Sequence, residues 1–223
     1  MPVFTKSIEL SEDFPTIRPT LNLNFTGARA LDPRVTFARA SSGTYVGSDG
    51  LIKTAGNNEA RFDHDPLTLE SLGLLIEESR TNQFPYSSDF STWATNNVSF
   101  VTGISDPEGG TNATKMVVSS TASGSGLAAF TTNDTTLTNG TTYTQSLWAK
   151  KNAFPVSNNA YFVIQIATST GFTPGHRNFD LSTGTLGSGD VSGSIVEYPD
   201  GWYRVSVTAQ ATTSGSGRMA IAI

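Results

Sequence analysis

Short segments in which apolar and polar residues alternate recur along most of this chain, with turn-forming residues between them. Alternation with a period of two indicates strands that bury one face, and turn clusters at short spacing are typical of an antiparallel β-sandwich. Such clusters lie at 106–110, 138–140 and 182–184. We therefore predict an all-β chain with an antiparallel sandwich over residues 87–223. Its predicted strands are Val98–Thr102, Ala113–Ser119, Gly126–Thr131, Tyr143–Lys150, Ala160–Ala167, Arg177–Leu181, Ser194–Tyr198, Trp202–Gln210 and Gly217–Ile223.

The composition argues against a helical architecture. Only 15% of the 223 residues are charged and 21 are glycine, whereas serine, threonine and asparagine are abundant. Threonine is restricted at its first side-chain torsion, and serine and asparagine compete for backbone hydrogen bonds, so such a chain forms helices poorly. The 13 Phe, 6 Tyr and 3 Trp residues are spread along the chain, which argues against disorder.

Charge and apolar content restrict the partners that we expect. A net charge of −5 does not favour binding to phosphates, so neither nucleic acid nor an anionic membrane surface is an expected partner. No apolar run approaches the roughly 18 residues of a membrane span, and the first residues do not resemble a secretory signal. Cysteine is absent, which removes disulfides and thiolate metal sites. We therefore expect that the protein does not insert into a membrane and that it is made in a cytoplasm.

The first 86 residues are expected to form two parts. Pro2, Pro15 and Pro19, followed by alternation in Leu21–Phe25, predict an extended arm over residues 1–30 that ends in one strand. A small β block is expected over residues 31–86, with one hairpin turn at 48–50 and another at Asp65-Pro66. The alternating segments of this block are Val35–Phe37, Gly43–Val46, Leu51–Lys53, Ala60–Asp63 and Leu72–Glu77.

Residues with catalytic potential form no recognised pattern. The run Asp63-His64-Asp65 is interpreted as a polar turn after a strand rather than as a metal or acid–base site. Glu77 and Glu78 are adjacent, so on a strand they point to opposite faces and do not form a carboxylate pair. Three further aspartates sit in separate turns, where capping a loop is commoner than binding calcium: Asp180, Asp190 and Asp200. We therefore predict no enzymatic activity, no cofactor and no metal site.

A carbohydrate site is the other function that these residue types allow. Alternation places Trp148 with Thr144, Ser146 and Lys150 on one face of its strand, and Trp202 with Arg204, Ser206 and Thr208 on one face of its own. A β-sandwich binds sugar when an aromatic ring stacks on a pyranose and polar side chains flank it. The candidate binding residues are Trp148, Tyr161, Phe172, His176, Arg177 and Trp202.

Residues 31–82 resemble a conserved block of bacteriophage structural proteins, above all tail-fibre and appendage proteins of phages that infect cyanobacteria. The matching runs are Leu31–Val46, Asp49–Ala55, Glu59–Pro66 and Leu72–Asn82. The remainder resembles the jelly-roll module that commonly follows this block and that is similar to carbohydrate-binding modules. This second resemblance rests on Tyr143–Lys150, Asn178–Gly184 and Asp200–Val205.

The resemblance implies a structural virion protein, made in the host bacterial cytoplasm and located in the virion. We expect a homotrimeric fibre or appendage subunit that docks on other virion proteins through residues 1–30 and displays its sandwich toward host surface polysaccharide. A capsid decoration protein and a free carbohydrate-binding module are the alternatives.

Related modules continue beyond the final alternating segment, whereas this sequence stops at Ile223. An apolar strand left unpaired would be an adhesive edge. We therefore expect either a partner strand from a neighbouring subunit or, preferably, a chain that is the front part of a longer fibre, with its sandwich truncated at the C-terminal end.

Overall fold

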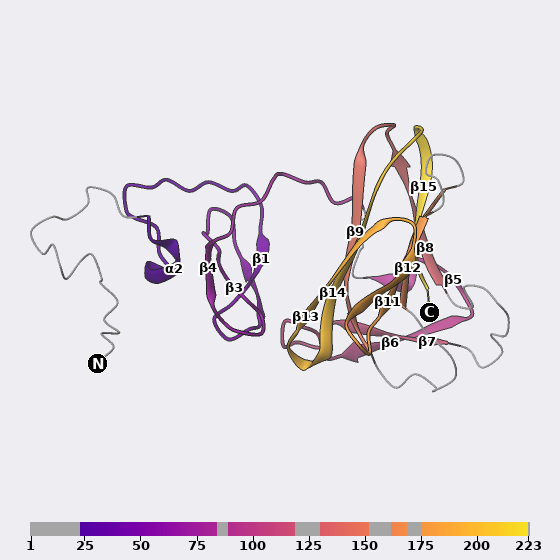
Figure 1. Ribbon diagram of the computed structural model, residues 1–223, viewed down its shortest axis with the longest axis horizontal. Coiled ribbons are helices and arrows are strands. Elements are labelled where there is room, and N and C mark those ends of the chain that lie inside the picture. The colour runs from indigo at the N-terminus through magenta and orange to yellow at the C-terminus, as the bar shows by residue number, and fades with distance from the viewer. Residues whose placement is uncertain (1–22, 84–88, 119–129, 152–161, 169–174, 223) are drawn as a thin grey trace, which may run out of the picture.

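The computed structural model describes residues 23–83, 89–118, 130–151, 162–168 and 175–222 (Figure 1). The predicted all-β class is confirmed. In this part of the chain, helix is limited to one α-helical turn, α2 (Phe25–Ala28), and two 3-10 turns, η1 (Phe90–Thr92) and η2 (Pro199–Gly201). The predictions for residues 1–22, Tyr161 and Phe172 lie outside the described residues.

The small β block consists of two antiparallel hairpins, as predicted. In the first, β1 (Gly43–Val46) pairs with β2 (Ile52–Ala55), and Gly50 takes a φ of +77° in the turn between them. That left-handed conformation suits glycine, which has no Cβ atom. In the second, β3 (Phe62–His64) pairs with β4 (Ser71–Leu74).

Side chains of the β3 region join the two hairpins by binding the backbone of β1. The Asp63 carboxylate accepts a hydrogen bond from the Val46 N–H at 2.7 Å, and the His64 Nδ1 donates to the Val46 carbonyl at 3.1 Å. Arg61, next to β3, donates to the Thr44 carbonyl at 2.9 Å. These side chains satisfy backbone groups at the edge of β1 that a neighbouring strand would otherwise pair.

Two expectations for the N-terminal part are wrong within the described residues. The end of the expected strand Leu21–Phe25 leads into α2, because the Asn24 side chain caps that turn by accepting from the Gly27 N–H at 2.9 Å. Val35–Phe37 is not a strand. There the Val35 N–H donates to the Asp32 carbonyl at 2.8 Å, which closes a turn.

The sandwich contains a six-stranded sheet in the order β12-β11-β10-β15-β8-β5 and a three-stranded sheet in the order β13-β14-β9, both antiparallel. A separate hairpin, β6-β7, lies across one end of them (Figure 1). The strands are β5 (Ala94–Asn96), β6 (Val98–Ile104), β7 (Ala113–Val118), β8 (Phe130–Leu137), β9 (Thr142–Lys150), β10 (Phe162–Thr168), β11 (Gly175–Asp180), β12 (Thr185–Gly189), β13 (Ser192–Tyr198), β14 (Trp202–Gln210) and β15 (Gly215–Ala222).

Eight of the nine strands predicted for the sandwich correspond to observed ones, and β14 has the predicted bounds. The ninth, Gly126–Thr131, lies mostly outside the described residues and shares only its last two positions with β8, which continues to Leu137. The sequence patterns missed β5 and β12. All three residues of β5 are exposed, and β12 lies at a sheet edge with its residues exposed or half-buried, so neither strand needs the apolar alternation that a core imposes.

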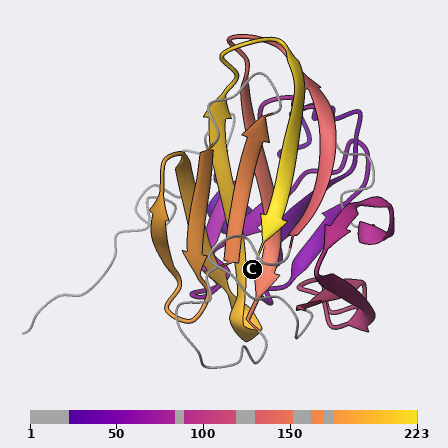
Figure 2. The ribbon, with the colours of Figure 1, turned by 90° about the vertical axis from the view of Figure 1, so that its right-hand side faces the viewer.

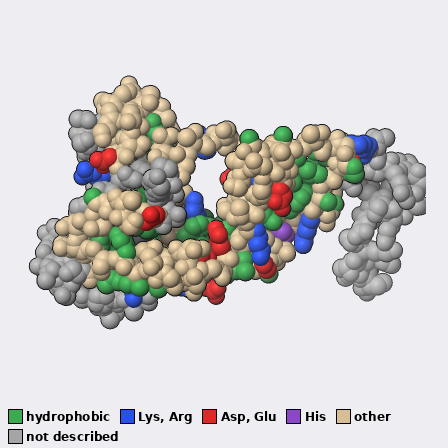
Figure 3. Space-filling view, turned by 180° about the vertical axis from the view of Figure 1, so that it is seen from behind, with side chains coloured by type: hydrophobic (Ala, Val, Ile, Leu, Met, Phe, Trp, Pro, Cys, Tyr) green, Lys and Arg blue, Asp and Glu red, His purple; other side chains and the backbone are tan. Residues whose placement is uncertain are grey.

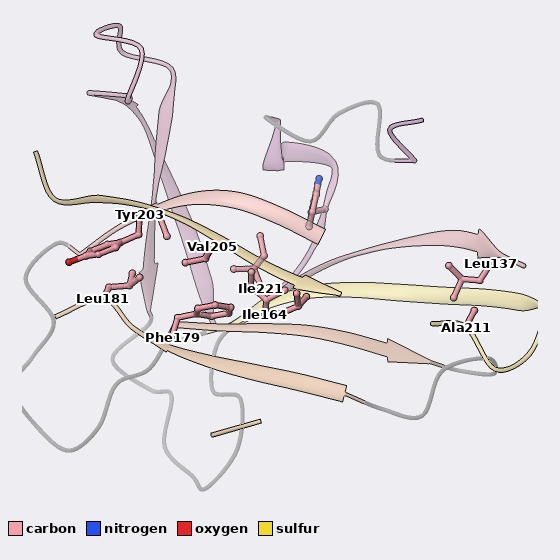
Figure 4. Close-up of a cluster of buried hydrophobic side chains, with 11 residues drawn as sticks. Leu137, Ile164, Phe179, Leu181, Tyr203, Val205, Ala211 and Ile221 are labelled. Atoms are coloured by element: carbon pink, nitrogen blue, oxygen red, sulfur yellow. The ribbon is translucent and has the colours of Figure 1, made fainter. Parts of the chain in front are cut away.

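The hydrophobic core lies between the two sheets (Figure 4). Val205 and Val207 of β14 are fully buried, and they contact a cluster that includes Ile164 of β10 and Phe179 of β11. The predicted inward face of β14 is therefore confirmed. The remaining members of the cluster are Trp93, Leu137, Ala149, Leu181, Tyr203, Ala211 and Ile221.

The last described strand is central rather than at an edge. β15 pairs with β10 on one side and with β8 on the other, and Figure 2 shows it in yellow between them. Ala220, Ile221 and Ala222 are buried there. The expectation that this strand is left unpaired as an adhesive edge is wrong, because β15 is paired on both sides and Ala220, Ile221 and Ala222 are covered within the chain.

The block lies beside the three-stranded sheet and contacts it through turns (Figure 1). The Ile52 N–H donates to the carbonyl of Pro107, in the turn between β6 and β7, at 3.4 Å. Gly50 packs close to Pro199 of η2, since a Cβ atom on Gly50 would lie 3.4 Å from the Pro199 Cγ. A cavity of about 50 Å³ remains where these turns meet, lined in part by Leu51 and Trp202.

Candidate binding face

The outer face of the three-stranded sheet, which points away from the six-stranded sheet, brings two tryptophans and two cations together. Trp148 of β9 lies opposite Arg204 of β14, and Lys150 lies opposite Trp202 in the same ladder. The Arg204 Cζ is 5.1 Å from the centre of the Trp148 ring, and the Lys150 Nζ is 5.7 Å from that of Trp202. Each tryptophan therefore faces a cation on the neighbouring strand, in cation–π geometry.

Tyr198 completes an aromatic cluster on this face. Its ring meets the Trp148 ring edge-on with centroids 4.4 Å apart. Because Tyr198 is on β13 and Trp148 is on β9, this contact spans β14, which lies between them. Trp202 is only 8% exposed. The two predicted tryptophans thus lie together, but Trp148 is half-buried against its neighbours and is not an isolated flat platform.

Arg204 is half-buried and carries its charge without a carboxylate partner among the described residues. Its Nη2 donates to the Ser146 Oγ at 2.6 Å. Burial lowers the pKa of the Arg204 guanidinium from its ordinary value of 12.5, because a charged group loses hydration when it leaves water. An arginine remains charged in proteins even so.

Hydroxyl groups extend the outer face beyond Arg204. The strand register aligns two rows of three residues, which we call the hydroxyl rows: Ser194, Ser206 and Ser146 in the first, and Ser192, Thr208 and Thr144 in the second. The Thr144 Oγ1 and the Thr208 Oγ1 are hydrogen-bonded at 2.8 Å. The four members on β9 and β13 are exposed, and the two on β14 are half-buried. This part of the sheet therefore presents hydroxyl groups to solvent.

His176 and Arg177 lie elsewhere, on β11 of the six-stranded sheet. Arg177 donates to the carbonyls of Val191 and Gly187, so its guanidinium links β11 both to β12 and to the connection between β12 and β13. The His176 Nδ1 is 3.1 Å from the Asp190 carboxylate. These contacts give both residues structural partners, and the structure does not bring them together with the two tryptophans.

The acidic and histidine residues of the block also have structural roles. Asp65 accepts from the N–H groups of Leu67 and Thr68 at 2.9 and 2.7 Å, as a polar turn requires, and these bonds lower the pKa of its carboxyl group. His64 is buried and lines a groove of about 270 Å³ on the block together with Tyr45 and Lys53. Among the described residues no group of three or more His, Cys, Asp or Glu side chains has an arrangement suited to a metal ion.

Sequence reasoning named Trp148 and Trp202 but omitted Arg204, Lys150 and Tyr198 from the candidates. Alternation within each strand already placed Arg204 and Lys150 on the same face as a tryptophan. It gave no information on which residues lie opposite one another, because that depends on the register between β9 and β14.

The sequence matches no family model, and no curated protein is significantly similar to it. None of the helices in the described part of the chain is long and apolar enough to span a membrane.

Proposed function

We propose that this protein is a structural subunit of a bacteriophage appendage that displays its β-sandwich toward glycans of the host surface. One observation carries the proposal: α2, the block and the sandwich follow one another in space as they do in sequence, with α2 on the side of the block away from the sandwich (Figure 1). In such an arrangement, residues 1–30 dock on the particle and the block acts as a spacer.

The contacts of the block support a spacer role. Its two hairpins are joined by the bonds of Arg61, Asp63 and His64 to the backbone of β1. Its first hairpin contacts the sandwich at two separate turns, through Ile52 and Gly50. Backbone groups that are paired in this way open rarely, which suits a part that transmits load and resists proteases. The resemblance of residues 31–82 to phage structural proteins points in the same direction.

Assembly into a homotrimer belongs to the same proposal. A single glycan site on a β-sandwich binds weakly, and several linked copies raise the effective affinity without new contacts. The virion, assembled in the host bacterial cytoplasm, is then the place where the protein functions.

Immunogold electron microscopy tests the proposal. Antibodies against the full chain should label a fibre, tail or neck position on phage particles from the host that expresses the protein, and excess free protein should abolish the label. Light scattering on the purified chain should give the mass of a trimer. Label over the whole head would instead favour a capsid decoration protein, and unlabelled particles from a lysate that contains the protein would contradict a virion role.

A further inference from the structure

We propose that the outer face of the three-stranded sheet binds an acidic polysaccharide, with Arg204 taking the carboxylate or sulfate group and the hydroxyl rows binding the sugar hydroxyls. The inference rests on the proposed function, since it names the class of glycan that the displayed sandwich would bind. It adds a requirement for negative charge on the ligand and assigns that requirement to one residue.

Arg204 differs from six other arginines of the chain in the group that its guanidinium binds. Four other arginines pair with carboxylates, and Arg39 and Arg177 donate to backbone carbonyls. For Arg204, the observed hydrogen-bond acceptor is the neutral Ser146 hydroxyl. A half-buried guanidinium gains most from a partner that is itself charged, and its planar fork fits the two oxygens of a carboxylate or sulfate. An oxyanion is therefore the chemical complement of this group.

The contact with Trp148 positions the guanidinium for such a partner. The Arg204 Cζ lies over the Trp148 ring, and the bond to Ser146 fixes the direction of the Nη2. An arginine held in this way loses little conformational entropy when it binds, so it is prepared for an anion before the ligand arrives. Lys150, which faces Trp202 on the same side of the sheet, adds a second positive charge nearby.

The surroundings of Arg204 indicate a saccharide rather than a simple anion. The first hydroxyl row lies directly beside Arg204 and Trp148. Ser206 is the next residue after Arg204 on the outer face of β14, and Ser146 is the residue next to Trp148 on the outer face of β9. Exposed hydroxyl groups both donate and accept hydrogen bonds, and those of a sugar do the same. Trp148 and Tyr198 are half-buried, so the exposed parts of their rings can supply apolar surface for C–H groups of a pyranose. A chain of sugar units laid along the strands would contact all three kinds of group.

The charge distribution argues against a more highly charged ligand. The chain carries a net charge of −5, and the pKa of Tyr198 is raised first by its burial and then by the negative charges of Asp63 and Asp65 of the block, which therefore lie near this face. A nucleic acid would bring its phosphates near these carboxylates. A polysaccharide needs only one acidic group beside Arg204, and its hydroxyl groups can occupy the rest of the face.

A chain-like ligand would approach the outer face from the side of the sandwich that faces the block. Figure 3 shows an opening between the block and the sandwich, and the three-stranded sheet is the layer of the sandwich nearest the block (Figure 1). The described contacts between the two parts are at Pro107 and Pro199, and Tyr198 and Trp202 line the cavity where these turns meet. The hydroxyl rows lie farther along the sheet, toward the end of β14 and the start of β9, and their residues do not line the cavity between the block and the sandwich.

Titration calorimetry of the full-length protein tests the inference. Three oligosaccharides of equal length serve as probes: an oligogalacturonate, a sulfated galactan oligomer and the neutral galactan oligomer. We expect at least one acidic probe to bind about tenfold or more tightly than the neutral one, in a salt-sensitive manner. Preference for the galacturonate assigns a carboxylate to Arg204, and preference for the sulfated probe assigns a sulfate ester. Equal binding of all three probes, or binding of none, overturns the inference.

Variants locate the site. Arg204→Gln should weaken binding of the acidic probe about tenfold or more. Arg218→Gln is the control: Arg218 is on β15 and forms an exposed ion pair with Asp134 on β8, so this substitution removes the same charge elsewhere and should leave binding unchanged. Ser194→Val, at an exposed position of the hydroxyl rows, should also weaken binding while preserving the far-ultraviolet circular dichroism spectrum. Equal losses in the Arg204 and Arg218 variants, or full binding of the acidic probe by the Arg204 variant, overturn the inference.

Failure of this inference is distinguishable from failure of the proposed function. Particles that are labelled by antibodies although the protein binds no acidic probe contradict the acidic-glycan site alone. A protein that binds the acidic probe through Arg204 but never labels particles contradicts the virion role and leaves the site intact.

Discussion

Gly217 of β15 lies so close to the buried side chain of Leu137 that a Cβ atom on Gly217 would be 2.0 Å from the Leu137 Cδ1. Leu137 is 1% exposed and belongs to the hydrophobic core. The absence of a side chain at Gly217 is therefore what allows Leu137 to fill its position, since packed interiors leave no room for an added methyl group.

The first prediction concerns this pair. Gly217→Ala should lower the free energy of unfolding by about 1–3 kcal/mol through overpacking, and Leu137→Ala should lower it by about 2–5 kcal/mol through loss of buried surface. Urea unfolding measures both. In the Leu137→Ala background the added methyl group enters vacated space, so the double variant should be more stable than the sum of the single effects predicts. Strict additivity would show that the two side chains do not compete for the same space.

The second prediction concerns Arg61. It is 5% exposed, and its Nη1 is 2.6 Å from the Glu77 carboxylate and 2.9 Å from the Thr44 carbonyl. Arg61→Met should destabilise the block by about 1–3 kcal/mol, because the buried guanidinium's charge-assisted hydrogen bonds are lost and the Thr44 carbonyl loses its donor. Hydrogen exchange should show faster exchange in β1 and β2.

Arg80→Met is the matched control for Arg61→Met, because Arg80 forms an ion pair with Glu78 at the surface. Surface pairs contribute little, so hydrogen exchange in β1 and β2 should be unchanged by this substitution. Equal effects of the two substitutions would contradict the structural role assigned to Arg61.

The third prediction concerns Gln145, a polar residue on the inner face of β9. It is 8% exposed, and its Oε1 has no hydrogen-bond partner among the residues that the structure describes. A buried polar atom without a partner is costly, so Gln145→Leu should raise the free energy of unfolding by about 1 kcal/mol. Thermal or urea unfolding measures the change. A clear loss of stability in this variant would mean that the amide forms bonds that matter to the folded state.

The fourth prediction concerns acid. Hydrogen bonds that Arg34 donates to the Asp32 carboxylate hold the pKa of this carboxyl group at about 2, below its ordinary value of 3.8. Bonds from backbone N–H groups likewise lower the pKa of Asp65 and Asp106, and a bond from Ser182 lowers that of Asp180. A carboxyl group whose pKa falls on folding stabilises the protein above its unfolded pKa and loses that contribution as pH falls to its folded pKa.

Stability should therefore decline as the pH falls from about 4 to about 2. Urea unfolding at a series of pH values measures the decline, and carboxyl NMR should place the Asp32 midpoint near 2. Arg34→Gln should move that midpoint upward toward 3.8. An Asp32 midpoint that does not respond to Arg34→Gln would contradict the assigned cause.

The local hairpins of the block were predictable because their signals are short-range. The 48–50 turn brings its flanking segments together whatever the rest of the chain does, and Gly50 supplies the left-handed conformation that this turn needs. The segment 21–25 was not predictable in the same way. Its alternation suggested a strand, but Asn24 caps α2, and a capping side chain outweighs so short a pattern.

The candidate site was predictable only in part. The pattern in each of β9 and β14 separates core residues from outer-face residues, and it put Trp148 and Trp202 outside the core. Tyr198 escaped notice because its contact with Trp148 crosses an intervening strand. Arg204 escaped notice because no feature of the sequence near it identifies the acceptor of its hydrogen bond, Ser146, which is 58 positions away.

The sequence by itself determined the all-β class, the period-two burial of strands such as β14 and the local turns, because steric preferences and side-chain alternation act over a few neighbouring residues. Only the tertiary structure decided that β15 enters the centre of a sheet, that Trp148 faces Arg204 and that the hydroxyl rows align. Those features depend on pairing and register between distant strands, which are fixed by how the buried faces of the two sheets fit together.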